Sequence, residues 1–143
     1  MLVECLLIGD SIAKGLHRFR PECALFAKVG ITSQQFLRSY KDPTPANNII
    51  ISLGSNDHAR IETEERLRQL RQKFKVGTTA YWILPAGVNP KSGISVEHVQ
   101  NAVRRVASEH QDVVLPIPVL SVDNVHPTEA GFKALAKQTK GEK

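Results

Sequence analysis

Short apolar runs alternate with amphipathic segments along the chain. The apolar runs have the length of single buried strands and are too short to span a membrane. The five predicted strands cover residues 3–8, 24–29, 48–53, 78–84 and 113–118. Between them, apolar side chains recur every three or four positions, which is typical of helices that bury one face. The predicted helices cover residues 12–19, 32–40, 63–75 and 127–140, together with a segment that Ser95 caps and that carries Val96, Val99, Val103 and Val106.

This alternation of strands and helices, with short links, predicts the fold class. The β-branched run Ile49-Ile50-Ile51 fits a central strand that is covered on both faces. We therefore expect an α/β protein, a three-layer α/β/α sandwich built on a five-stranded parallel sheet with right-handed crossovers. The length of 143 residues predicts a single domain over residues 1–143. The pattern of apolar positions alone does not fix the order of the strands.

Composition adds expectations about cysteine chemistry and location. Hydrophobic residues make up 41% and charged residues 23% of the chain, which is usual for a folded globular protein. Cys5 and Cys23 lie in apolar runs, and no Cys/His pair has zinc-finger spacing, so two buried, reduced thiols are expected. Met1 leads straight into the first apolar run without a secretory signal pattern. A cytosolic location is therefore expected, with a piece cut from a longer precursor as the alternative, and no membrane partner.

The charge of the chain is moderately basic. Lys and Arg number 19 and Asp and Glu number 14, which gives a net charge of +5. The basic residues are spread out, as in the predicted helix that holds Arg66, Arg68 and Arg71, where Glu62 and Glu64 offset them. A solvated helix face explains this pattern better than a nucleic-acid site. Attraction to an anionic substrate or surface stays open, and the sequence indicates no oligomeric state.

Residues that could carry chemistry follow the predicted strands where each strand ends. Gly9-Asp10-Ser11, Gly30 and Gly54-Ser55-Asn56-Asp57 follow the first three strands, and Asp123-Asn124-Val125-His126 precedes the last helix. The carboxyl ends of parallel strands lie at one edge of a sheet, where such folds bind their ligands. We therefore expect these segments at a single rim, with Pro85-Ala86-Gly87 as part of its wall.

Three of these residues match the needs of acyl transfer. Ser11 is the predicted nucleophile, because a serine hydroxyl is weak until a base takes its proton. His126 is the predicted base, and Asp123, three residues upstream, is close enough to orient and stabilise its imidazole. Taken singly, Ser11 could cap the next helix, and Asp123 and His126 could be a capping group and an exposed loop histidine.

The developing negative charge of acyl transfer needs donors that are fixed in advance. The predicted oxyanion hole consists of the backbone N–H of Ser11, the N–H of Gly30 and the side-chain amide of Asn56. Gly30 alone could be a turn glycine, and Asn56 could cap the helix that follows. His58 is predicted to be a rim-loop residue rather than a second base. The prediction depends on all of these residues occurring together at strand ends.

The four segments, with Pro127 after the last, resemble the sequence blocks of the SGNH hydrolases, the GDSL-type esterases and lipases. The resemblance implies a flavodoxin-like sheet with strand order 2-1-3-4-5. It also implies that Ser11 attacks, that His126 is the base supported by Asp123, and that Gly30 and Asn56 complete the oxyanion hole. No metal or cofactor is implied. The chain departs from the pattern around Gly30, which lacks a flanking asparagine and a second glycine, so the resemblance does not define the acyl pocket.

The expected function is that of a serine esterase that hydrolyses small acyl esters, plausibly acetyl esters, of a carbohydrate or similar alcohol. The alternative is a catalytically inactive binding or structural module, because fold alone does not imply activity. A nucleotide-binding domain is a weaker reading, since the sequence contains neither a Gly-x-Gly-x-x-Gly motif nor a P-loop.

Overall fold

Five parallel strands form the centre of the molecule, in the order β2-β1-β3-β4-β5. The computed structural model describes residues 3–141. Its strands are β1 (Val3–Gly9), β2 (Ala24–Ala27), β3 (Ala46–Ser52), β4 (Thr79–Leu84) and β5 (Val113–Pro116). The predicted parallel sheet is confirmed, and the strand order is the one that the resemblance implied. All five strands therefore end at one edge of the sheet.

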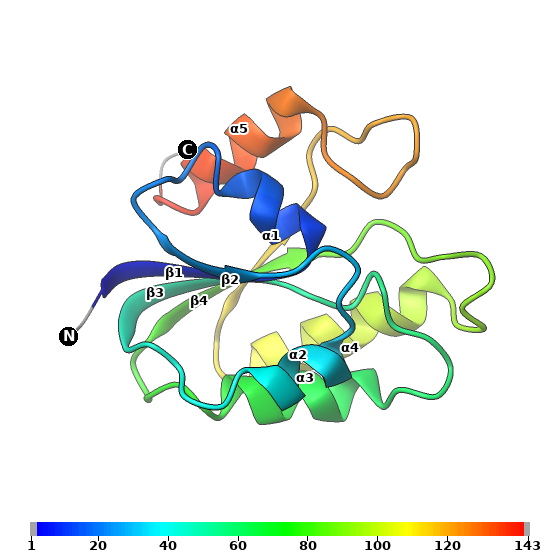
Figure 1. Cartoon of the computed structure of the whole chain (residues 1–143), viewed down its shortest axis with the longest axis horizontal. Helices are drawn as coiled ribbons and strands as arrows, with labels where there is room; N and C mark the ends of the chain where they lie inside the picture. The colour runs from blue at the N-terminus through cyan, green and yellow to red at the C-terminus, as the bar shows by residue number, and fades with distance from the viewer. Residues whose placement is uncertain (1–2, 142–143) are drawn as a thin grey trace.

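Helices cover both faces of this sheet (Figure 1). The helices are α1 (Ser11–Leu16), α2 (Ser33–Ser39), α3 (Thr63–Arg71), α4 (Val96–Glu109) and α5 (Glu129–Gln138). One face carries α1 and α5, and the opposite face carries α2, α3 and α4 (Figure 1). The predicted three-layer sandwich is confirmed. Among residues 3–141, each helix is too short or too polar to cross a membrane.

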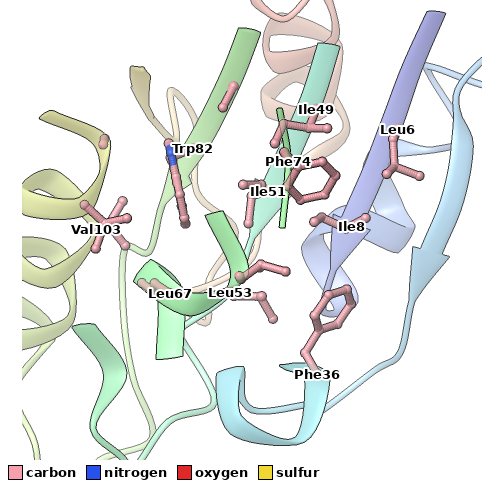
Figure 2. Packing of buried hydrophobic residues seen from close by; sticks show 14 of the residues in the cluster. Leu6, Ile8, Phe36, Ile49, Ile51, Leu53, Leu67, Phe74, Trp82 and Val103 are labelled. Carbon is pink, nitrogen blue, oxygen red and sulfur yellow. The ribbon is translucent and has the colours of Figure 1, made fainter. Parts of the chain in front are cut away.

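The side chains of the central strands alternate between two cores. Ile49 and Ile51 of β3 point into the larger core, which Figure 2 shows packed with Trp82 and Phe36. Ile50 points into the smaller core under α1 and α5. All three isoleucines are fully buried, so the β-branched run marks the central strand, as predicted.

The last helix begins later than the sequence pattern predicts. Thr128 caps α5 by accepting a hydrogen bond from the N–H of Gly131 (3.1 Å), so Pro127 is not the first helical residue. Pro127 instead pairs with Leu120 in an isolated antiparallel bridge. This bridge closes a loop between β5 and α5. The position of Pro127 is thus set by the loop rather than by the helix.

The expectation of two reduced thiols is wrong. Cys5 and Cys23 form a disulfide with a Cα–Cα distance of 4.8 Å. The parallel register places Leu6 opposite Ala24, which brings the preceding residues of the two segments side by side. The sulfurs also lie near Glu22, but sulfurs bonded to each other are not metal-binding thiolates. Disulfides persist mainly in oxidising compartments, so this pair weighs against the cytosolic location that the sequence predicts.

The solvated helix face expected for the basic residues of α3 does not extend to Arg71. Arg71 is 3% exposed, and its guanidinium donates two hydrogen bonds, of 2.8 and 2.9 Å, to Asp112. Asp112 also accepts a hydrogen bond from Trp82 Nε1 (2.9 Å). Arg68, one turn earlier, pairs with glutamates of α3 and α4 at the surface. These arginines therefore join helices to each other and to the sheet.

Candidate active site

Ser11 and His126, which are 115 positions apart in the sequence, are in contact at the carboxyl edge of the sheet. Ser11 Oγ lies 2.8 Å from His126 Nε2. On the other side of the imidazole, Nδ1 lies 2.7 Å from a carboxylate oxygen of Asp123. A carboxylate can only accept, so the Nδ1 proton of a neutral imidazole points to Asp123 and leaves Nε2 to accept from Ser11. The three residues predicted to act together form one hydrogen-bonded chain.

The turn after β1 holds the serine in place. Gly9 has a φ of +138°, and a Cβ at this position would lie 1.9 Å from the carbonyl oxygen of Ser52. Only glycine therefore lets β1 lie this close to the end of β3. The N–H of Asp10 donates to the same carbonyl over 3.0 Å. Ser11 follows at the first position of α1, where a backbone N–H has no acceptor within the helix.

Asp10 is a buried anchor that the sequence analysis did not single out. Its carboxylate is inaccessible to solvent and accepts hydrogen bonds from the N–H of Ile12 (3.0 Å) and the hydroxyls of Ser52 (3.0 Å) and Ser55 (3.1 Å). Burial raises the pKa of Asp10 against the opposing effect of these hydrogen bonds. Asp10 is the cap of α1, so the capping role that Ser11 could have filled belongs to its neighbour.

His126 and Asp123 lie on the exposed loop that the Leu120–Pro127 bridge closes. One oxygen of Asp123 accepts from the N–H groups of Val125 and His126, both at 2.9 Å, and from the hydroxyl of Ser121 at 2.8 Å. Hydrogen bonds from these backbone amides, and then from the His126 imidazole and the Ser121 hydroxyl, hold the pKa of Asp123 well below its usual range. The side chains of His126 and Asp123 are 44% and 48% exposed.

The wall of the site that was predicted at residues 85–87 lies against this loop. A Cβ added to Gly87 would lie 2.9 Å from the side chain of Val125 and 3.0 Å from the carbonyl oxygen of Asn124. Asn124 has a φ of +59°, which tightens the turn between Asp123 and His126. The lack of a side chain at Gly87 thus lets the loop pack closely on the end of β4.

The predicted oxyanion donors lie on loops that are tied to each other. Asn56 Nδ2 donates to the carbonyl oxygen of Ile31 over 3.1 Å, which fixes the amide beside the Gly30 loop and leaves it a second hydrogen. Asn56 does not cap a helix, because α3 begins at Thr63. Gly30 has a φ of +79°, and nothing lies within 4 Å of its missing Cβ. Its turn thus requires glycine, and space remains beside it for a ligand.

Asp57 is a second buried carboxylate whose role the sequence analysis missed. It is 1% exposed and accepts from the N–H of Ser33 (2.8 Å), the hydroxyl of Ser33 and the hydroxyl of Thr63 (2.7 Å). It therefore joins the starts of α2 and α3 to the loop that carries Asn56. The sequence signal for this role was a hydroxyl residue at the start of each of two predicted helices, Ser33 and Thr63. His58 is exposed and accepts from the N–H of Arg60 (3.3 Å), as expected of a rim-loop residue.

Neither a model of a known protein family nor a curated protein matches the sequence. Solved structures do match it. A GDSL-like lipase from Bacteroides thetaiotaomicron is 18% identical, with a TM-score of 0.71 over 96% of this chain and 86% of that chain. The catalytic domain of peptidoglycan O-acetyltransferase A from Streptococcus pneumoniae, solved with a methylsulfonyl adduct, is 18% identical, with a TM-score of 0.67 over 99% and 92%.

A carbohydrate acetylesterase family member from Sinorhizobium meliloti is also similar, at 13% identity and a TM-score of 0.59 over 97% of this chain and 100% of that chain. At these identities the likeness shows a common fold. The chain therefore has the α/β fold of GDSL-type lipases and esterases, as the four sequence blocks implied.

Proposed function

We propose that the protein is a serine esterase that hydrolyses small acyl esters, acetyl esters first among them, of a carbohydrate or similar alcohol. The observation that carries the proposal is the hydrogen-bonded chain from Ser11 through His126 to Asp123, with distances of 2.8 and 2.7 Å. A serine that donates to an imidazole oriented by a carboxylate is an activated nucleophile. An inactive binding module would have no need of this alignment.

In the first half of the proposed reaction, Ser11 Oγ attacks the carbonyl carbon of the ester. His126 Nε2 takes the serine proton, and Asp123 stabilises the imidazolium that forms. The carbonyl oxygen becomes an oxyanion, to which the N–H groups of Ser11 and Gly30 and the amide of Asn56 donate hydrogen bonds. The C–O bond to the alcohol then breaks, and the alcohol leaves with the proton from His126.

In the second half, water removes the acyl group. His126 takes a proton from the water as the water attacks the acyl-serine, and the same three donors hold the second oxyanion. Ser11 then leaves with the proton and the acid is released. The exposure of His126 and Asp123 gives water direct access to this step.

The open rim supports a preference for small acyl groups on an accessible carrier. A long acyl chain gains its binding energy from burial, whereas the side chains of His126 and Asp123 are nearly half exposed. The solved structures of similar fold include proteins named as a carbohydrate acetylesterase and a peptidoglycan O-acetyltransferase. These names support acetyl groups on carbohydrate as the first substrates to try.

Hydrolysis of p-nitrophenyl acetate tests the proposal. We expect Ser11→Ala to lower kcat by roughly a thousandfold or more, because it removes the nucleophile. Ser108→Ala is the matched control, since Ser108 lies exposed on α4 and bonds to a backbone carbonyl there. Equal rates for wild type and Ser11→Ala would contradict the mechanism. A panel of acetylated sugars and longer acyl esters then ranks the substrates.

A further inference from the structure

A cavity of about 430 Å³ opens directly beside Gly30. Its lining includes backbone and side chains from the loop after β2 and from α2: Lys28, Gly30, Ile31, Gln35, Arg38 and Ser39. The cavity therefore borders one of the proposed oxyanion donors, while Ser11, Asn56 and His126 are not among its lining residues.

The charge of this cavity is uniformly positive. Lys28 and Arg38 are its two charged lining residues, and the lining contains no acidic side chain. Within residues 3–141, neither residue takes part in an ion pair, whereas Arg20, Arg68 and Arg71 each bind a carboxylate. Two cations without an ion-pair partner among residues 3–141, both in the lining of one cavity, favour an anionic ligand there.

The backbone of both residues is held by contacts of the same loops and helix that carry the site. The N–H of Lys28 donates to the carbonyl of Gly9 (3.0 Å), in the turn that carries the nucleophile. The carbonyl of Lys28 accepts from the N–H of Ile31 (3.3 Å), the residue whose carbonyl accepts from Asn56. Arg38 lies on α2, which begins at Ser33 and is fixed there by Asp57. The points from which both side chains extend are thus fixed relative to Ser11 and Asn56.

We propose that this cavity, the Lys28–Arg38 cavity, binds an anionic group of the substrate, a carboxylate or a phosphate. The inference rests on the proposed esterase function and deepens it, since it names the substrate as an ester that carries a negative charge beyond the reacting carbonyl. The net charge of +5 adds long-range attraction for such a substrate. Arg38 supplies a planar fork that matches either oxyanion, and Lys28 supplies a point charge.

The test compares three acetyl esters that differ in charge: 4-acetoxybenzoate, 4-acetoxyphenyl phosphate and the neutral 4-acetoxybenzamide. For the wild type we expect kcat/KM to be roughly fivefold higher for an anionic ester than for the neutral one, a ratio expected of two exposed ion pairs. The double variant Lys28→Gln/Arg38→Gln is expected to lose this preference, so that it hydrolyses the acetyl esters of the anionic compounds no faster than that of the neutral 4-acetoxybenzamide. Added salt should shrink the wild-type preference.

The matched control is Arg104→Gln/Lys137→Gln, which removes the same charge from exposed positions on α4 and α5. If the preference falls equally in both double variants, general attraction replaces the cavity as its cause. A wild type that hydrolyses all three esters equally well overturns the inference but leaves the esterase proposal intact. A preference for one anionic ester over the other identifies the anion.

A binding measurement separates failure of this inference from failure of the proposed function. If no ester is hydrolysed, the esterase proposal fails, and binding of 4-acetoxybenzoate to the Ser11→Ala protein decides about the cavity. NMR shift changes of the amides of residues 28–39 that vanish in the triple variant with Lys28→Gln and Arg38→Gln support it. Binding that is unchanged in the triple variant, or not detectable in Ser11→Ala, overturns it.

Discussion

Asp10 and Asp123, the two carboxylates that support the candidate nucleophile and the candidate base, accept similar hydrogen bonds in opposite surroundings. Asp10 accepts from one backbone N–H and two serine hydroxyls, and Asp123 accepts from two backbone N–H groups and one serine hydroxyl. Asp10 is fully buried, whereas the Asp123 side chain is 48% exposed. Burial therefore raises the pKa of Asp10, while hydrogen bonds lower that of Asp123. The serine side of the site is built into the core, and the histidine side is built onto the surface.

This difference predicts that the two halves of the site fail in different ways. A buried network loses stability when one member is removed, because the remaining polar groups lose their partners away from water. An exposed network exchanges its partners for water at little cost, so its loss is felt in the chemistry. Stability and activity should therefore separate between Asp10 and Asp123.

The largest expected effect is on activity. Asp123→Ala should lower kcat by roughly a hundredfold or more, because the imidazole loses the group that orients it and stabilises its charge. Its Tm should fall only slightly, because the exposed amides of the loop become hydrated. Hydrolysis of p-nitrophenyl acetate and thermal unfolding on the same sample check both parts. A large drop in Tm would show that the loop is part of the folding unit and would remove the contrast.

Asp10→Ala should lower stability more than Asp123→Ala does. It leaves the hydroxyls of Ser52 and Ser55 and the N–H of Ile12 without their acceptor, and we expect the free energy of unfolding to fall by about 3 kcal/mol. Urea unfolding measures this loss. Asp10→Asn, which keeps the shape and an acceptor oxygen, should recover most of it. If Asp10→Ala is as stable as the wild type, the buried anchor does not hold the turn.

A smaller effect concerns how the free energy of unfolding depends on pH, because the pKa values of Asp10 and Asp123 are shifted in opposite directions. The folded-state pKa of Asp10 is raised above its unfolded value of 3.8, so this group contributes most stability below pH 3.8, and the contribution is lost as pH rises through the folded pKa. For Asp123 the sign is opposite, because a lowered pKa gives stability above pH 3.8 that is lost as pH falls. The stability of Asp10→Asn relative to the wild type should therefore increase with pH. Urea unfolding of both proteins from pH 3.8 upward measures this difference in stability. A difference that does not change with pH would contradict the raised pKa of Asp10.

The sheet and the meeting of Ser11 with His126 could be predicted from the sequence for one reason. Apolar runs that end in glycine mark the ends of strands, and the ends of parallel strands share an edge. The segments that carry Ser11 and His126 are thereby placed at the same edge, although they are far apart in the chain. The resemblance to SGNH hydrolases added the strand order, which the pattern of apolar residues does not contain.

Features that depend on register or on loop closure could not be predicted in this way. Cys5 and Cys23 suit an apolar run as thiols or as a disulfide, and only the register of β1 against β2 brings them close enough to bond. Pro127 fits the first position of a helix, but its bridge to Leu120 holds it in the loop. Asp57 stands beside a predicted site residue, and only the packing of α2 and α3 shows what it binds.

The central claim, that His126 activates Ser11, is tested most directly by labelling with a fluorophosphonate. Attack by Ser11 Oγ forms an O–P bond, the P–F bond breaks, and the serine proton passes to His126. We expect one label per chain, mapped to Ser11 by peptide mass spectrometry, with a labelling rate roughly a thousandfold lower in folded His126→Gln. A label on another residue, or a rate that His126→Gln leaves unchanged, would contradict it.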